Sequence, residues 1–210
     1  LKEFIARFAA NASKSKQATS RKKELEKLEF VDMKPSSRKY PYVDFKPNRE
    51  VGNEILTVTN LTKNGFFENV SFTVHQGDKI AFVCQNANVV TMLFKILMGE
   101  DSADGGNFEW GSTVTPSYLP ENNDAFFKDC GLSLVDWIAQ YSQEKDQTFL
   151  RSWLGRMLFS GEEVLKKVNV LSGGEKMRCM IARMQLKNAN CLILDTPTNH
   201  LDLESIQAFN

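Results

Sequence analysis

The sequence predicts a mixed α/β domain that follows a basic helical arm. An unbroken apolar run at Cys191–Leu194 has the composition of a buried strand, and alternating β-formers at Ile55–Leu61 predict another strand far upstream. Between them, apolar residues at helical spacing predict a helix over Gly174–Leu186. The chain has 210 residues, of which 42% are hydrophobic and 25% are charged. This is enough for one domain with a sizeable core and an appendage, and it excludes disorder throughout.

The amino-terminal arm differs from the rest of the chain in its charge. Residues 1–50 hold 13 Lys and Arg against 7 Asp and Glu, whereas residues 51–210 hold 13 against 19. No Gly or Pro interrupts residues 2–29, and apolar side chains recur there at helical spacing. We therefore expect an amphipathic basic helix over residues 1–32. Three prolines then predict an extended linker over residues 33–53.

This segregation of charge favours an arm that binds RNA through its phosphates, because binding releases counterions along the nucleic acid. A merely solvated helix face is the more common reason for such lysines, and that alternative stays open. The side chains that we expect to contact RNA are cations in the middle of the arm: Lys14, Lys16, Arg21, Lys22 and Lys23.

The body of the protein is predicted to occupy residues 54–210. Its expected strands are Ile55–Leu61, Asn69–Val74, Lys79–Val83 and Cys191–Leu194. Its expected helices are Thr91–Met98, Leu134–Tyr141, Thr148–Phe159 and Gly174–Leu186. Large side chains at helical spacing are expected in the core of a small helical subdomain: Trp137, Phe149, Trp153 and Met157.

Several classes of protein are disfavoured by the composition. The four cysteines, Cys84, Cys130, Cys179 and Cys191, lack the spacing of a zinc site or a disulfide framework, so we expect reduced thiols. No run of about eighteen apolar residues could span a membrane, which favours a soluble cytoplasmic protein without a membrane partner. The first residue is leucine and the last follows a dense motif, so we expect a piece of a longer protein.

Two motifs near the carboxyl end carry the chemistry. The segment Leu171-Ser172-Gly173-Gly174-Glu175 opens a helix, where free N–H groups and a hydroxyl can meet an anion. Taken alone, an ordinary serine N-cap with two glycines would explain it equally well. The second motif is the apolar strand that ends in Asp195, which is how P-loop NTPases hold Mg²⁺. Both motifs in this order, one helix apart, are specific.

These residues resemble the ATP-binding cassette (ABC) superfamily. LSGGE resembles its signature, LILD its Walker B strand, and the segment with Asn199, His200, Leu201 and Asp202 its D-loop. The arm, TNHLDLESI and the segment LGRMLFS particularly resemble the ABC-F family and its YbiT-like branch. The resemblance implies a P-loop α/β cassette with a small helical subdomain, preceded by a long linker helix and incomplete at its carboxyl end.

The resemblance also implies partners and cofactors. ABC-F proteins carry two cassettes in tandem, bind ATP and Mg²⁺, lack a transmembrane domain, and act on ribosomes with the linker reaching toward the tRNA. This chain would then hold the linker's second helix and most of the second cassette, with the N-terminal cassette of the same protein as its partner.

The departures from the family pattern concern one ATP site. The Walker A pattern GxxxxGK[ST] falls on residues 84–91, where both glycines and the lysine are absent. Thr196 stands at the position of the catalytic glutamate, Pro120 at that of the Q-loop glutamine, and residues 63–66 lack the aromatic A-loop. The nucleotide-binding positions of this degenerate loop are Cys84, Asn86, Ala87, Val89, Val90, Thr91 and Met92. Thr91 and Asp195 remain as the expected magnesium ligands, and we assign no catalytic role to His75 or His200.

The intact and the altered motifs together predict an asymmetric pair of cassettes. The signature residues Leu171, Ser172, Gly173, Gly174 and Glu175 act in trans in this superfamily, and so does the D-loop. This cassette would lend them to its partner's ATP site, while its own site holds nucleotide weakly or not at all. Other interpretations remain: a rebuilt loop that still binds ATP, a pseudo-ATPase interaction module, or the cassette subunit of an ABC transporter. Whether this cassette is itself an ATPase is left open by the residues.

Overall fold

The computed structural model describes residues 40–199, 201 and 206 of the chain. The predicted helix over residues 1–32 and its five candidate RNA contacts lie outside the described residues, as do His200 and Asp202 of the D-loop. The chain divides into two units between residues 38 and 39, and all elements below belong to the second.

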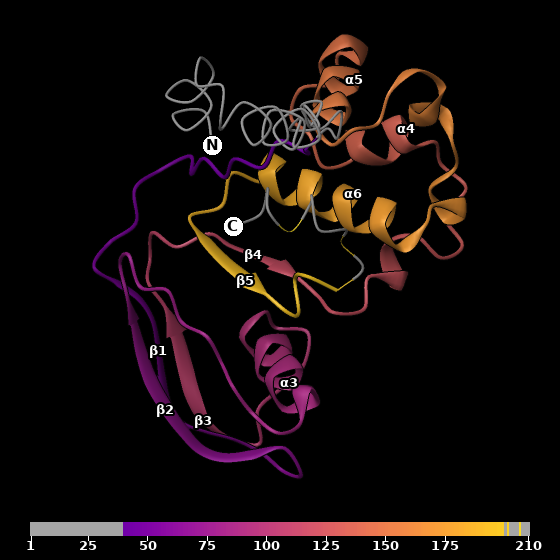
Figure 1. Ribbon diagram of the computed structural model, residues 1–210. Helices are drawn as coiled ribbons and strands as arrows, with labels where there is room; N and C mark the ends of the chain where they lie inside the picture. The colour runs from indigo at the N-terminus through magenta and orange to yellow at the C-terminus, as the bar shows by residue number, and fades with distance from the viewer. Residues whose placement is uncertain (1–39, 200, 202–205, 207–210) are drawn as a thin grey trace, which may run out of the picture. The chain divides into compact units, whose positions relative to one another are not determined.

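An antiparallel sheet forms the first part of this unit. Strand β1 (Glu54–Lys63) lies in its centre, with β2 (Phe67–His75) on one side and β3 (Gly105–Trp110) on the other. Helix α3 (Ala87–Leu97) lies beside this sheet (Figure 1). Apolar side chains of β1 and α3 are buried in one cluster: Leu56, Val58, Leu61, Leu93, Ile96 and Leu97. Leu56 and Val58 alternate along β1 onto the same face, and the register shift between Val58 and Leu61 returns the Leu61 side chain to the same buried cluster.

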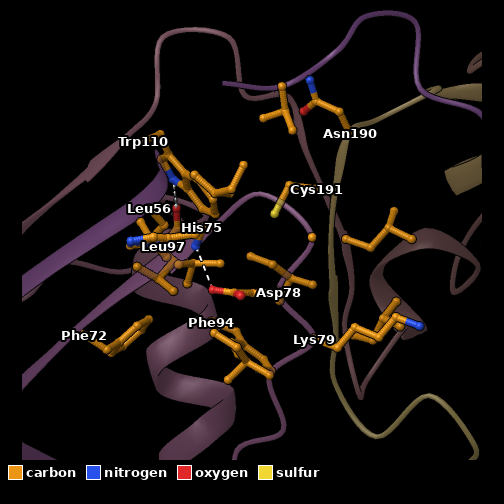
Figure 2. A pocket seen from close by; sticks show the side chains of 18 of the residues that line it. Leu56, Phe72, His75, Asp78, Lys79, Phe94, Leu97, Trp110, Asn190 and Cys191 are labelled. Carbon is orange, nitrogen blue, oxygen red and sulfur yellow. Dashed lines mark hydrogen bonds between the residues drawn. The ribbon is translucent and has the colours of Figure 1, made fainter. Parts of the chain in front are cut away.

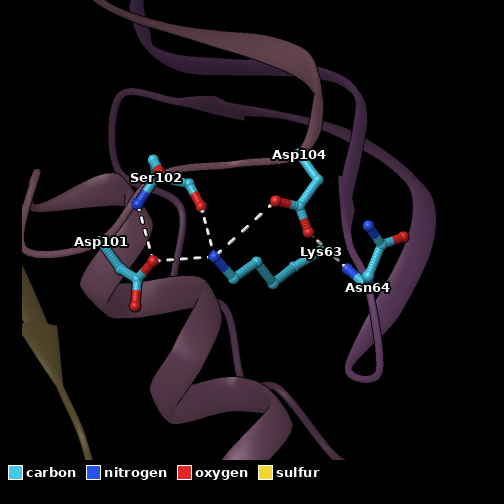
Figure 3. A network of polar contacts seen from close by, with 5 residues as sticks. All are labelled: Lys63, Asn64, Asp101, Ser102 and Asp104. Carbon is cyan, nitrogen blue, oxygen red and sulfur yellow. Dashed lines mark hydrogen bonds and ion pairs between the residues drawn. The ribbon is translucent and has the colours of Figure 1, made fainter.

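A salt-bridge network closes the far end of this sheet (Figure 3). Lys63 Nζ lies 2.8 Å from Asp101 Oδ1, and it also donates to the Ser102 carbonyl at 2.8 Å. Asp104 accepts a hydrogen bond from the Asn64 N–H and lies 4.0 Å from Lys63 Nζ. The hydrogen bond with Asp101 raises the pKa of Lys63. Lys63 and Asn64, which stand at the expected A-loop position, therefore connect the β1–β2 hairpin to the segment that follows α3.

A second, parallel sheet contains β4 (Pro116–Leu119) and β5 (Cys191–Leu194), which pair in register from Pro116 with Cys191 to Leu119 with Leu194. The helical elements lie between them in sequence: the 3-10 helices η1 (Asp124–Phe126), η2 (Gly161–Leu165) and η3 (Val168–Val170), and the α-helices α4 (Leu134–Ala139), α5 (Gln147–Arg156) and α6 (Gly173–Leu186). Their core includes Trp137 and Met157, while Phe149 and Trp153 pack against it half-buried, which confirms the predicted helical core. All four cysteines are free, as expected.

The predicted strand Lys79–Val83 is wrong as an element. In the structure this segment forms no strand, and Val83 is 94% exposed. Ile80 and Phe82 of this segment line a cavity of about 570 Å³ that residues of β5 line as well. Figure 2 shows Lys79 of the segment and Cys191 of β5 at this cavity. An apolar run forms a buried strand only where neighbouring strands supply hydrogen bonds, and among the described residues β5 pairs only with β4. Within the described residues, no helix is long and apolar enough to cross a membrane.

Candidate functional site

A buried carboxylate lies at the carboxyl end of β5. Asp195 is 3% exposed, and the Thr91 hydroxyl of α3 donates to its Oδ2 at 2.7 Å. The Tyr118 hydroxyl of β4 lies 3.5 Å from the same oxygen. The parallel register brings these groups together, because the Asp195 N–H donates to the Leu119 carbonyl at 2.9 Å and so continues the β4–β5 pairing. The structure therefore joins the two residues that we expected to share a metal ion.

Tyr118 is a member of this site that our sequence analysis missed. Its side chain is 6% exposed, and burial raises its pKa, as does the nearby Asp195 carboxylate. It therefore stays a neutral hydrogen-bond donor. The sequence signal is limited to the tyrosine itself, because a buried tyrosine needs a partner for its hydroxyl.

The loop before α3 and the start of this helix contain the residues that align with the Walker A pattern. Helix α3 begins at Ala87, and the Asn86 side-chain oxygen accepts a hydrogen bond from the Asn88 N–H at 3.1 Å. The Val89 N–H donates to the Asn86 carbonyl at 3.1 Å. Thus Asn86 satisfies the amides of the second and third helix residues from within the chain. No residue from Cys84 to Thr91 has a positive φ, so the loop lacks the left-handed steps that turn successive N–H groups toward one anion.

Thr196 follows the buried carboxylate in a strained conformation. Its φ of 46° is unusual for a β-branched residue, and its Oγ1 is buried without a hydrogen-bond partner among the described residues. The Asn199 N–H donates to the Thr196 carbonyl at 3.0 Å, which turns the chain at the start of the D-loop segment. On the β4 side, half-buried Pro120 directly follows the strand. Neither Thr196 nor Pro120 supplies a carboxylate or an amide to this end of the sheet.

The predicted signature opens helix α6. Ser172 is its N-cap, and Ser172 and Glu175 form a capping box in which the Ser172 N–H donates to Glu175 Oε2 at 2.8 Å. Burial alone would raise the pKa of Glu175, but hydrogen bonds from Ser172 and the nearby cations hold it below its usual value. Ser172 and Gly173 are exposed at this helix start. The Glu175 N–H donates to Ser172 Oγ at 3.4 Å, while the N–H groups of Gly173 and Gly174 have no acceptor among the described residues.

The predicted residues thus fall into two groups that rest on different cores. Thr91 belongs to α3, which packs in the sheet cluster, whereas the helix that carries the signature packs in the helical cluster. Leu171 is buried at the base of that helix. His75 lines the cavity in Figure 2, away from any catalytic grouping, and its N–H donates to Asp78.

The residues present can be tested against the cofactors that the motifs imply. A threonine hydroxyl and a carboxylate are oxygen ligands of the kind that Mg²⁺ prefers, so Thr91 and Asp195 fit that ion. The described part of the chain holds no cluster of three or more His, Cys, Asp or Glu side chains that would bind a metal alone. A phosphate fits less well, because Asn86 already caps α3.

Comparisons with known proteins identify the family to which the chain belongs. The sequence profile described as ABC transporter matches residues 67–199, and a second profile with the same description matches residues 1–45. The chain is 59% identical to the uncharacterized ABC transporter ATP-binding protein YkpA of Bacillus subtilis and 38% identical to the probable ATP-binding protein YbiT of Escherichia coli O157:H7. Each match covers 100% of this chain and 40% of the relative.

A plant relative and a solved structure extend the comparison. ABC transporter F family member 2 of Arabidopsis thaliana is 32% identical over 97% of this chain, which covers 31% of that protein. The fold resembles that of a putative metal-chelate type ABC transporter with a TM-score of 0.59, at 22% identity over 75% of this chain and 65% of the other. The predicted α/β cassette fold is therefore confirmed. The chain spans less than half the length of the curated relatives that it matches.

Proposed function

The chain belongs to the ABC transporter family as an ATP-binding domain with ABC-F homologues, and we propose that it is the second cassette of an ABC-F protein that lends its signature to the other cassette's ATP site. In this proposal its own site is impaired. Domains of this family generally bind ATP with Mg²⁺. In a pair of cassettes, either this chain's own ATP site or the site of the other cassette could hydrolyse it.

The observation that carries the proposal is the contrast between two helix starts. At α3, the Asn86 side chain occupies the position where a phosphate oxygen would accept the helix amides. At α6, the cap comes from Ser172, but the exposed Gly173 leaves its N–H open to a ligand from outside. Two adjacent N–H groups, of Gly173 and Gly174, have no acceptor among the described residues, whereas among the first three residues of α3 only the Ala87 N–H has none, so the signature offers a γ-phosphate the larger donor surface.

The catalytic position of the same site supports this asymmetry. A threonine hydroxyl is a poor base for the attacking water, and Thr196 Oγ1 is buried. Val90 replaces the lysine that would place a point charge on the β- and γ-phosphates. The site thus keeps a magnesium-type pair, Thr91 and Asp195, but lacks both the charge and the base that phosphoryl transfer requires.

The first expectation is that this chain alone hydrolyses ATP negligibly. Preorganised charge supplies most of the catalysis in phosphoryl transfer, and the lysine and the glutamate are both missing. We expect a turnover at least about a thousandfold below the roughly 1 s⁻¹ of slow phosphotransferases. Phosphate release with excess MgATP measures it, and Asp195→Asn is the control for a contaminating ATPase. A rate near 1 s⁻¹ that disappears in Asp195→Asn would contradict the proposal.

We extend the proposal to the arm, which would carry the cassette to the ribosome or a tRNA in the cytoplasm. Its support is the excess of cations in residues 1–50 and the family profile that matches residues 1–45. The proposed boundaries are a helix over residues 1–32, a linker over 33–53 and the cassette from residue 54.

A charge-removal experiment tests the arm. Replacing its five middle cations with glutamine should weaken ribosome association and lower the slope of log affinity against log salt by about one for each phosphate that the arm no longer neutralises. Lys34→Gln, in the linker, is the matched control. Sedimentation with purified ribosomes at several salt concentrations measures both quantities. An unchanged slope would assign these cations to a solvated helix face. The cations replaced are Lys14, Lys16, Arg21, Lys22 and Lys23.

A further inference from the structure

A second cavity, of about 660 Å³, lies between the extended residues 42–46 and helices α5 and α6. Its walls include Tyr42, Lys46, Phe149, Trp153 and Arg156. None of these residues takes part in the ATP-site or signature groups described above. The volume lies within the range of small-ligand sites.

One of the residues that line this cavity is an arginine that contacts two aromatic rings. Arg156 Cζ lies 5.0 Å from the ring centroid of Trp153 and 5.7 Å from that of Tyr42. Within the part of the chain that the structure describes, its guanidinium makes no hydrogen bond and no ion pair, and the residue is exposed. Cation–π contacts fix the plane of the guanidinium while leaving its N–H donors free.

The rings are themselves fixed by hydrogen bonds. Trp153 Nε1 donates to the Ala182 carbonyl of α6 at 3.2 Å, and Phe149 stacks on Trp153 with centroids 5.8 Å apart. The Tyr42 hydroxyl donates to Asp44 Oδ2 at 2.9 Å. An aromatic surface next to an unbonded guanidinium is thus pre-formed.

Hydrogen bonds also fix the backbone of residues 42–48 beside the cavity. The Tyr42 N–H donates to the Arg156 carbonyl at 2.8 Å, and Gln185 Nε2 donates to the Tyr42 carbonyl at 3.3 Å. Further along, the Asn48 N–H donates to the Asn188 carbonyl at 3.0 Å. The extended segment is therefore anchored on both helices, and a ligand would meet a wall that needs little reordering.

The net charge of the lining favours an anionic ligand, because two cations, Arg156 and Lys46, accompany one carboxylate, Asp44. Arg156 and Lys46 are cations, and Asp44 is already paired with Lys46 at 3.1 Å. An arginine fork matches the oxygens of phosphate, and the half-exposed ring of Tyr42 offers a face to a base. A carboxylate of an acidic peptide would use the fork but leave the aromatic faces without a planar partner.

We propose that this cavity binds one nucleotide, with the phosphate on Arg156 and the base against the aromatic wall of Tyr42, Phe149 and Trp153. A free nucleotide and an unpaired nucleotide of RNA share this chemistry. Only the RNA source rests on the proposed function; the site itself does not.

The test uses the full chain and two probes, a fluorescently labelled ten-residue oligouridine and uridine monophosphate. We expect Arg156→Gln to raise the Kd for the oligonucleotide about fivefold to tenfold. Arg156→Lys should fall in between, because lysine keeps the charge but loses the fork. Arg151→Gln is the matched control, since Arg151 is exposed on the same helix and does not line the cavity. Circular dichroism verifies that each variant is folded.

Photo-crosslinking distinguishes this site from the arm. Ultraviolet crosslinks of the oligonucleotide should map to Tyr42 or Trp153 and should persist in the variant with the five arm cations removed. Crosslinks confined to residues 1–39, or equal losses in Arg156→Gln and Arg151→Gln, would overturn the proposal. Displacement of the oligonucleotide by an equimolar polyglutamate peptide would overturn it in favour of an acidic protein partner.

Uridine monophosphate then identifies the source. Competition by the mononucleotide at comparable concentration supports a free-nucleotide site, and binding of the oligonucleotide alone supports RNA. Because these experiments contain no ribosome and no ATP, their failure leaves the proposed cassette function standing, and the failure of that function leaves this site standing.

Discussion

Replacing Gly106 with alanine is expected to lower the free energy of unfolding by about 3 kcal/mol or more. Gly106 has a φ of +73°, and an added Cβ would lie 2.2 Å from the Asn60 carbonyl oxygen of β1. The register between β1 and β3 shifts between Thr59 and Thr62, with Asn60 itself at a φ of 47°. The bulge therefore brings backbone against backbone, and the atoms that would have to move belong to the central strand of the sheet.

The neighbouring glycine is the matched control for this prediction. At Gly105, φ is not positive and an added Cβ would meet only the Thr62 Cβ at 3.6 Å, an ordinary contact. We expect Gly105→Ala to change stability by less than about 1 kcal/mol. Urea unfolding followed by circular dichroism measures both variants. Equal stabilities of Gly105→Ala and Gly106→Ala would show that the bulge yields easily and that the sheet does not depend on it.

The elements with complete local signals were predictable. Strand β5 matches the predicted Cys191–Leu194, and α6 begins one residue before the predicted Gly174. In α6 the capping box of Ser172 and Glu175 and the apolar periodicity agree with each other. Strands β3 and β4 were not predicted, because one begins with two glycines and the other has four residues and starts with proline. Their pairing comes from neighbours distant in sequence.

The errors before α3 have a related cause. The apolar run Lys79–Val83 has the composition of a buried strand. Composition does not show whether a neighbouring strand is in place to form hydrogen bonds with it. Helix α3 begins at Ala87, four residues before the predicted start at Thr91, because Asn86 caps it. The Walker A interpretation assigns residues 84–91 to a phosphate-binding loop, and Asn86 is therefore not considered as the N-cap of a helix.

The proximity of Thr91 to Asp195 was predictable from the sequence, whereas the contact of Tyr118 with the same carboxylate was not. The resemblance indicated that Thr91 and Asp195 lie together, and their hydrogen bond agrees. Tyr118 was missed because its approach to Asp195 depends on the register between β4 and β5. A register is set by the whole sheet, and a single strand's sequence does not contain it.

The largest functional effect is expected from substitutions in the signature residues, and a much smaller one from substitutions in the altered loop before α3 and its helix. In a two-cassette protein that contains this chain, Gly173→Asp should lower ATPase activity at least about a thousandfold. The exposed first turn of α6 would face the partner's γ-phosphate, and a carboxylate there repels it and takes up the helix amides. Ser172→Arg should act similarly by filling the same space. Steady-state phosphate release by the two-cassette protein measures both variants.

Thr91→Ala in the same protein should reduce the rate less than about threefold, because in the proposed arrangement the hydroxyl belongs to an impaired site, with Val90 at the lysine position and Thr196 at the glutamate position. The variant loses a hydrogen bond to the buried Asp195, so Thr91→Ser, which keeps the hydroxyl, separates stability from activity. Thermal unfolding verifies that each variant is folded at the assay temperature. If folded Thr91→Ala lost as much activity as Gly173→Asp while Thr91→Ser kept it, the magnesium-type pair of this cassette would have to take part in turnover. The two helix starts would then serve two working sites, and the asymmetry inferred from Asn86 and Val90 would be wrong.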